Sequence, residues 1–172
     1  MRFTIHDHRP EDFETLWRLD QACFAPGIAY SRGELKSYMR RPGSFTLIAE
    51  RVEGSASGNG EFDRESAVLG FLVAECSRRG IGHVITIDVR AEARRHRVGS
   101  ALLDAAELRL RASQCYMVRL ETAVDNVGAV FFYKRRGYNV MQTIPHYYSS
   151  GVDALLLEKD LLLQVEPQSV SR

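Results

Sequence analysis

Residues 86–103 read TIDVRAEARRHRVGSALL, and this stretch decides how the rest of the chain is interpreted. It begins inside a run, residues 83–89, whose alternating β-branched residues place Ile85, Ile87 and Val89 on one side of a strand. Apolar residues then recur at helical spacing: Val98, Ala101, Leu102, Ala105, Leu108 and Ala112. The stretch therefore predicts a strand, a turn and a helix.

The turn between strand and helix carries a cluster of basic side chains: Arg90, Arg94, Arg95, His96 and Arg97. A turn that opens a helix exposes backbone N–H groups without intrahelical partners, and together with the helix dipole these groups favour a phosphate. Arginine side chains add charge-assisted hydrogen bonds to such an anion. From the residues alone, a phosphate site and a solvated charged turn stand as equal alternatives.

The composition indicates a globular protein. The chain has 172 residues, of which 45% are hydrophobic and 26% charged, which is enough for a sizeable core. We expect a single domain over residues 1–163 and a C-terminal tail over residues 164–172. The net charge of +1 argues against nucleic acid or a membrane surface as a partner, so any anion site must be local.

The cysteines and the start of the chain bear on its location. Cys23, Cys76 and Cys115 form no CxxC pair and are odd in number, so we expect reduced thiols and a cytoplasmic protein. The first residues lack the apolar segment of a signal peptide, and no apolar run approaches the length of a membrane span. His6 and His8 share one face of a predicted strand, but without a third ligand they do not predict a metal site.

Strands and helices follow one another in an irregular order. The expected strands are residues 2–7, 44–52, 67–76, 83–89, 116–122, 138–148 and 152–161. The expected helices are residues 10–23, 31–40, 98–112 and 126–136. Ser31 and Glu34 form a capping box, and residues 53–66, rich in Gly, Ser and charge, are expected to form a mobile hairpin loop. This order predicts an α/β (α+β) fold with a mixed sheet rather than a regular βαβ repeat.

Four segments, in order along the chain, carry a resemblance to a known family. They are RRHRVG at 94–99, LETAVDN at 120–126, FFYKRRGY at 131–138 and PHYYSSGVDA at 145–154. They resemble the motifs of the GNAT superfamily of N-acetyltransferases, in particular its RimI-type ribosomal-protein alanine acetyltransferases and the archaeal N-terminal acetyltransferases. Two positions depart from the motifs: Arg97 stands where the first glycine of R/Q-x-x-G-x-G/A is usual, and Val152 replaces an acidic residue. The resemblance implies a central mixed seven-stranded twisted sheet flanked by about four helices.

The resemblance also implies a reaction, the direct transfer of acetyl from acetyl-CoA to an amine without a metal. It makes Glu121 the base that takes a proton from the amine and Tyr133 the acid that serves the departing thiolate. A backbone N–H near Val89 would meet the developing oxyanion. The residues that it implies at acetyl-CoA are Ile87, Asp88, Val89, Arg94, Arg95, His96, Arg97, Val98, Gly99, Ser100 and Asn126. We expect the amides of residues 95–100 to bind the pyrophosphate, with the Arg97 side chain turned outward.

The implied acceptor is a protein N-terminus, such as that of a ribosomal protein. The residues implied at the acceptor are Phe24, Ile28, Tyr30, Tyr147 and Tyr148. At pH 7, deprotonation costs about 1 kcal/mol for an α-amine of pKa ~7.8 and roughly 4.6 kcal/mol for a lysine of pKa ~10.4. This difference favours an α-amine for a single carboxylate base but does not rule out lysine. A lysine or small-amine acetyltransferase therefore stays open, as does a non-catalytic acyl-CoA-binding module, which Arg97 and Val152 would suit. We expect a monomer or a weak dimer.

Structural roles compete with these assignments. Taken alone, Glu121 is a typical surface carboxylate near a strand end, and Tyr133 on an apolar helix is more often a core tyrosine with a satisfied hydroxyl. Asn126 suits a helix N-cap whatever the function. Tyr147 and Tyr148 also suit packing within a strand.

Overall fold

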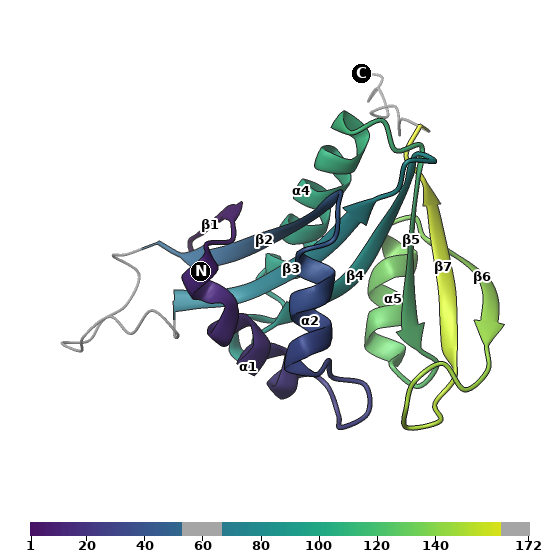
Figure 1. The fold of residues 1–172 in the computed structure, drawn as a ribbon, viewed down its shortest axis with the longest axis horizontal. Coiled ribbons are helices and arrows are strands. Elements are labelled where there is room, and N and C mark those ends of the chain that lie inside the picture. Colours follow the sequence, from purple (N-terminus) through teal and green to yellow (C-terminus); the bar gives the residue numbers. More distant parts are fainter. Residues whose placement is uncertain (53–66, 163–172) are drawn as a thin grey trace, which may run out of the picture.

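The computed structural model describes residues 1–52 and 67–162 (Figure 1). The hairpin loop expected at 53–66 and the tail expected at 164–172 lie outside the described residues. Within the described ranges, no helix is both long and apolar enough to cross a membrane.

The described strands form one seven-stranded mixed sheet, as expected. The strands are β1 (Phe3–Asp7), β2 (Ser44–Arg51), β3 (Val68–Cys76), β4 (Ile81–Val89), β5 (Met117–Ala123), β6 (Asn139–Ile144) and β7 (Ala154–Asp160). The helices are η1 (Pro10–Asp12), α1 (Phe13–Cys23), α2 (Arg32–Met39), η2 (Ala91–Ala93), α4 (Val98–Ala112) and α5 (Val127–Arg135). The strand order is β1-β2-β3-β4-β5-β7-β6, and β4 and β5 are parallel whereas the other neighbours are antiparallel.

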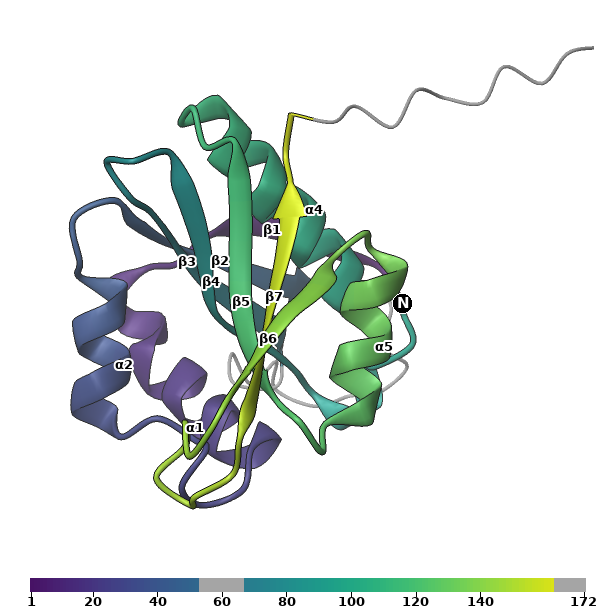
Figure 2. The ribbon, with the colours of Figure 1, turned by 90° about the vertical axis from the view of Figure 1, so that its right-hand side faces the viewer.

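Helices cover both faces of the sheet (Figure 2). On one face, α1 and α2 bury a cluster that includes Leu16, Leu35 and Phe71. On the other face, α4 and α5 lie over a larger cluster that includes Leu102 and Tyr133. In the middle of the sheet, β3 is therefore buried along most of its length.

A β-bulge in β4 changes which side chains share a face. The pairing with β3 joins Val73 to Thr86 and Ala74 to Val84, so Ile85 is the extra residue. Ile85 consequently packs in the cluster under α1 and α2, whereas Ile87 and Val89 pack in the cluster under α4. The expectation that Ile85, Ile87 and Val89 share one side of the strand is wrong, because one extra residue breaks the two-residue period of a strand.

The buried face of α4 also differs from the expected stripe. Leu108 is 68% exposed, and the charged residue Glu107 is 3% exposed instead. The buried positions are Val98, Leu102, Leu103, Ala106, Glu107 and Leu110. Leu108 stands roughly 200° around the helix from Ala106, at 3.6 residues per turn, and so points to solvent. The apolar face of α4 was therefore predicted correctly at Val98 and Leu102 and wrongly at Leu108.

The helix caps follow the sequence. Ser31 Oγ accepts a hydrogen bond from the Glu34 amide at 3.3 Å, and the Ser31 amide donates to Glu34 Oε2 at 2.9 Å, which confirms the capping box. Asn126 Oδ1 accepts from the Ala129 amide at 3.1 Å and caps α5. Gly137 follows α5 with φ +88°, a conformation that glycine adopts without the strain a Cβ would cause.

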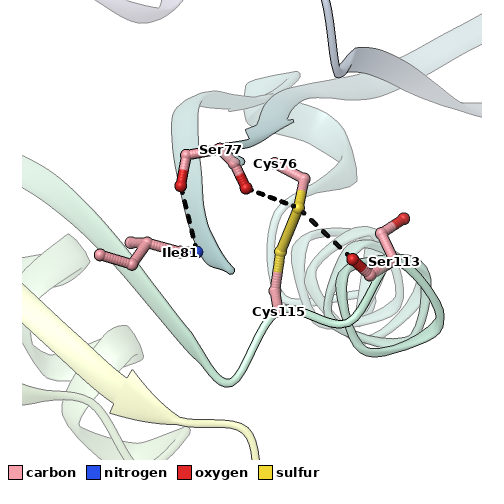
Figure 3. The surroundings of a disulfide bond; sticks show 5 residues. All are labelled: Cys76, Ser77, Ile81, Ser113 and Cys115. Carbon is pink, nitrogen blue, oxygen red and sulfur yellow. Dashed lines mark hydrogen bonds between the residues drawn. A yellow bond between two sulfur atoms is a disulfide. The ribbon is translucent and has the colours of Figure 1, made fainter. Parts of the chain in front are cut away.

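A disulfide joins Cys76 to Cys115 (Figure 3), so the expectation of reduced thiols is wrong for these two cysteines. Cys76 ends β3, and Cys115 follows α4 just before β5. Their Cα atoms are 6.7 Å apart, within the range that a disulfide spans, although 39 positions separate them in sequence. Their proximity depends on where α4 ends against the sheet, which cysteine spacing does not reveal. Cys23 is a free thiol.

Candidate active site

The candidate site lies where β4 and β5 separate. The two parallel strands pair only near their start, from Ile81 with Met117 to His83 with Arg119. Beyond that point the strands diverge (Figure 1), while β4 continues to Val89 and β5 to Ala123. The later part of each strand therefore leaves the backbone groups on its inner edge unused for pairing between β4 and β5.

Glu121 lies just past this divergence and receives two hydrogen bonds. His83 Nε2 is 2.6 Å from Glu121 Oε2, and the Tyr147 hydroxyl also bonds to Glu121. Burial raises the pKa of Tyr147 to about 12, and the charge of Glu121 adds to the rise, so the hydroxyl keeps its proton and donates. The Glu121 side chain is only 14% exposed. Glu121 is thus held by neighbours rather than freely solvated.

His83 is the site residue that the sequence did not single out. It appeared only as the first residue of an expected strand, although β4 begins two residues earlier at Ile81. The available signal was a lone histidine among β-branched residues. A lone histidine does not by itself indicate a site. It becomes a candidate only when the structure shows that β4 lies parallel to β5 and pairs His83 with Arg119.

Tyr133 is both a core residue and a neighbour of the site. It is 5% exposed and packs edge-on against Tyr138, with the ring centroids 5.6 Å apart. Burial raises the pKa of Tyr133, and the nearby Asp88 and Tyr148 raise it further. The pKa of Tyr148 is raised by burial and then by Tyr147 and Glu121. Because the pKa of Tyr133 responds to Asp88 and Tyr148, Tyr133 on α5 lies near the end of β4 and near the β6–β7 connection. Its hydroxyl is protonated at neutral pH, as is usual for tyrosine, and can donate a hydrogen bond.

The connection between α1 and α2 is fixed by Tyr30. Buried Asp20 accepts a hydrogen bond from the Tyr30 amide at 2.8 Å, and the Tyr30 hydroxyl donates to the Ile85 carbonyl at 3.2 Å. Burial raises the pKa of Asp20 to about 6, although the bonds from Tyr30 and Gln21 lower it. Tyr30 thereby ties the loop to β4 near its bulge.

The two expected acceptor segments meet. Ser149 Oγ donates to the Gly27 carbonyl at 3.0 Å, and a Cβ on Gly27, at φ +86°, would lie 3.0 Å from that of Ser150. Tyr147 and Tyr148 pack ring to edge at 5.0 Å in the same connection. Phe24 and Ile28 belong to the α1–α2 connection, but the hydrogen bond that joins it to the β6–β7 connection comes from Gly27.

The end of β4 offers backbone rather than side chains to a ligand. Asp88 is 1% exposed, and its Oδ2 accepts from Thr86 Oγ1 at 3.2 Å. Within the described residues, Asp88 Oδ1 accepts no hydrogen bond, and burial raises the pKa of Asp88 well above its usual value. The Val89 carbonyl already accepts from Arg94 Nε at 3.1 Å. A ligand beside Ile87, Asp88 and Val89 would therefore meet the inner backbone edge of β4.

The arginine-rich turn has an unusual backbone. Arg95 and Arg97 both have φ +65°, and Arg97 caps α4 in the left-handed conformation. The glycine of the motif would adopt this φ without strain, which gives a physical reason for glycine at position 97. Within residues 98–112, the first turn of α4 contains no acidic residue. Its free amides and dipole therefore remain available to an anion.

The basic side chains of the turn divide into two groups. Arg90 Nε donates to the Val68 carbonyl at 2.6 Å and Arg94 Nε to that of Val89, so both help to hold the ends of β3 and β4. Arg95, His96 and Arg97 are exposed. Val98 is buried at 1% exposure and Ser100 is half-buried, so Val98 can serve a ligand only through its amide.

These residues fit the acetyl-CoA that the resemblance implies. A Cβ on Gly99 would make only ordinary contacts, with Val89 at 3.5 Å and Phe132 at 3.8 Å, so protein packing does not demand glycine there. Close approach of a ligand to the backbone would account for it. Asn126 uses Oδ1 to cap α5, which leaves its side-chain NH2 group available to a ligand.

Among residues 1–52 and 67–162, no group of three or more His, Cys, Asp or Glu is placed to hold a metal ion.

Replacing Arg97 with glycine is expected to raise the free energy of unfolding. The left-handed conformation costs an L-residue roughly 1–2 kcal/mol, and the greater chain entropy of glycine offsets part of this, so we expect a gain of about 0.5–1 kcal/mol. Arg97→Ala keeps the Cβ and should change stability by less than about 0.5 kcal/mol. Urea unfolding of both variants measures the difference.

The same two variants test whether the turn binds acetyl-CoA, and through which groups. If the amides hold the pyrophosphate, calorimetric titration should show Kd changes below about fivefold, since an exposed ion pair contributes up to about 1 kcal/mol. A loss of more than about 100-fold in both variants, the size of a strong charged hydrogen bond, would place the Arg97 side chain on the phosphates.

The chain is similar to known acetyltransferases. Residues 10–138 match the Acetyltransferase (GNAT) family. The chain is 31% identical over 137 residues to N-alpha-acetyltransferase 20 of Dictyostelium discoideum, which covers 77% of this chain and 72% of that protein. It is 36% identical over 81 residues to an N-alpha-acetyltransferase of Sulfurisphaera tokodaii, which covers 46% of this chain and 48% of that one.

The structure resembles that of Ard1 from Thermoplasma volcanium, with a TM-score of 0.77 and 25% sequence identity over 93% of this chain and 98% of the other. The chain spans 48% to 62% of the length of the first curated relatives that it matches.

Proposed function

This chain belongs to the GNAT family of acetyltransferases, and from that premise we propose that it transfers acetyl from acetyl-CoA to the free α-amino group of a protein N-terminus. The observation that carries the proposal is the placement of Glu121. A largely buried carboxylate stands where β4 and β5 diverge, next to the connections that would hold the acceptor. The similarity to two N-alpha-acetyltransferases supports an α-amine as the acceptor.

In this proposal one set of residues binds acetyl-CoA and another set transfers protons. Acetyl-CoA supplies the activated acetyl group, and the amides at the start of α4 and the inner edge of β4 hold it. Glu121 takes the proton that the amine nitrogen must lose, and the Tyr133 hydroxyl donates to the departing sulfur. A tyrosine hydroxyl with the ordinary pKa of about 10 is already protonated at pH 7. Burial raises the pKa of Tyr133 and Tyr148 further, so in this proposal both can donate a hydrogen bond while the Glu121 carboxylate accepts the amine proton.

The acceptor peptide lies between the α1–α2 connection and the β6–β7 connection. These two segments touch through Gly27 and Ser149, and each contributes tyrosine side chains. Tyrosine suits this role because it combines a flat apolar surface with a hydrogen-bonding hydroxyl. A ribosomal protein as the acceptor, a cytoplasmic location, and a monomeric or weakly dimeric state are parts of the same proposal.

The proposal is tested with acetyl-CoA and two peptides of one sequence that contains an internal lysine. One peptide has a free N-terminal alanine or serine, and the other is blocked at its α-amine. Mass spectrometry should find one acetyl group, at the N-terminus of the first peptide only. Acetylation of lysine in the blocked peptide alone would contradict the proposal. Binding of acetyl-CoA without transfer to any amine would favour a non-catalytic module.

A further inference from the structure

His83 lies between two carboxylates on the face of the sheet that carries α1 and α2. Its Nε2 is 2.6 Å from Glu121 Oε2, and its Nδ1 is 3.8 Å from Glu75 Oε1. Glu75 is the partner of His83 on β3, and Arg119 is its partner on β5. Glu75 is in turn 3.6 Å from Arg41 Nη1, which gives that carboxylate a cation of its own.

The unequal distances decide where the imidazole proton is. A separation of 2.6 Å is a short, charge-assisted hydrogen bond, whereas 3.8 Å is outside hydrogen-bonding range. A carboxylate without a proton only accepts, so the hydrogen between His83 and Glu121 belongs to Nε2. Neutral His83 is then the Nε2–H tautomer, and Nδ1 carries no proton.

We propose that His83 is a positioning residue for the base: its Nε2–H holds Oε2 of Glu121, so that Oε1 is the oxygen presented to the acceptor amine. This inference rests on the proposed function. In the step that it serves, the N–H bond of the amine breaks, the proton joins Oε1 of Glu121, and the electron pair stays on nitrogen. The nitrogen can then hold its new bond to the acetyl carbon as the bond from carbon to sulfur breaks.

His83 suits this role better than Tyr147, the other donor to Glu121. His83 lies within a strand that is paired on both sides, to Glu75 and to Arg119. Tyr147 lies in the β6–β7 connection, which is the segment proposed to contact the acceptor peptide. A group on a strand is held more closely than a group on a loop, so the fixed orientation of Glu121 is set by His83.

The chain offers a matched control. His6 Nε2 is 2.8 Å from Glu50 Oε2, a second histidine–glutamate pair of similar geometry, between β1 and β2 at the far edge of the sheet. The experiment compares His83→Phe, His83→Gln and His6→Phe in steady-state acetylation of a peptide with a free N-terminus. Thermal melting of each variant shows that it is folded before its rates are compared.

His83→Phe is expected to lower kcat about 10- to 100-fold, the range of one hydrogen bond to a charged group, with the KM for acetyl-CoA changed less than about threefold. His83→Gln should stay within about fivefold of the unchanged protein because its amide supplies an N–H donor. His6→Phe should leave kcat unchanged. A His83→Phe rate equal to that of the unchanged protein, or no recovery in His83→Gln, would overturn the inference.

Nitrogen NMR of the histidine rings gives a result that does not depend on turnover. The signals of the neutral His83 ring should show a protonated Nε2 and an unprotonated Nδ1, and Glu121→Leu should abolish this preference. A proton on Nδ1 would overturn the inference even if a phenylalanine variant does not fold. If the unchanged protein acetylates no α-amine but shows the expected tautomer, the proposed function fails while the contact between His83 and Glu121 stands.

Discussion

Replacing Glu121 with glutamine is expected to lower kcat by about 100-fold or more, the range for loss of a general base. Glutamine has the same shape and still accepts from His83 Nε2, which lies 2.6 Å from Oε2. It cannot take a proton. When a neutral amine attacks the thioester, its nitrogen becomes cationic and must lose a proton before the bond to sulfur breaks. Without Glu121 that proton has only water to receive it.

The control for this variant is Glu50→Gln, since Glu50 bonds His6 at 2.8 Å in the same way but at the other edge of the sheet. Steady-state kinetics with acetyl-CoA and a free N-terminal peptide should show normal kcat for the control. The KM for acetyl-CoA should change less than about threefold in both variants, because Glu121 is not assigned to the cofactor. A Glu121→Gln enzyme with undiminished kcat would remove Glu121 from the reaction.

Replacing Glu107 with alanine is expected to lower the free energy of unfolding by about 3–5 kcal/mol, the usual effect of removing one partner of a buried ion pair. Glu107 on α4 is 3% exposed. Its carboxylate accepts from Lys159 Nζ at 2.6 Å and from the Tyr138 hydroxyl at 3.1 Å. Without it, a mostly buried ammonium and a buried hydroxyl lose their partners in the core. Urea denaturation measures the loss.

Two further variants separate this effect from ordinary charge loss. Asp7→Ala removes an ion pair with Arg109 in which both side chains are largely exposed, and it should cost less than about 1 kcal/mol. Glu107→Leu combined with Tyr138→Phe and Lys159→Met should recover most of the stability, because the buried partners of Glu107 are replaced together and its other partner, Arg111, is 41% exposed. A loss below about 1 kcal/mol for Glu107→Ala would mean that water reaches the site and replaces the carboxylate.

Local features were largely predictable from the sequence. The capping box at Ser31 and the cap at Asn126 depend on a few neighbouring residues, and both occur where they were expected. The order of strands and helices was also predicted correctly, since hydrophobic periodicity within each segment determines it. The resemblance of four short motifs led to the family that residues 10–138 match.

The errors share one cause, which is that each depended on a neighbouring element. Ile85 changed sides because β3 pairs with a bulged β4. Leu108 is exposed and Glu107 buried because α4 meets the sheet along a face that Lys159 and Tyr138 complete. Cys76 and Cys115 are bonded because the end of α4 stops beside the end of β3. None of these contacts leaves a pattern within a single segment.

For the candidate site, the sequence by itself determined the residue types and their order: an arginine-rich turn before a helix, a glutamate near a strand end, and tyrosines in later segments. Only the tertiary structure decided which of these groups meet. It placed His83 beside Glu121 because β4 and β5 run parallel and then diverge, and it brought Gly27 against Ser149 across 122 positions. Sequence patterns report what each segment can form on its own, whereas contacts between distant segments follow from how the sheet and its helices pack.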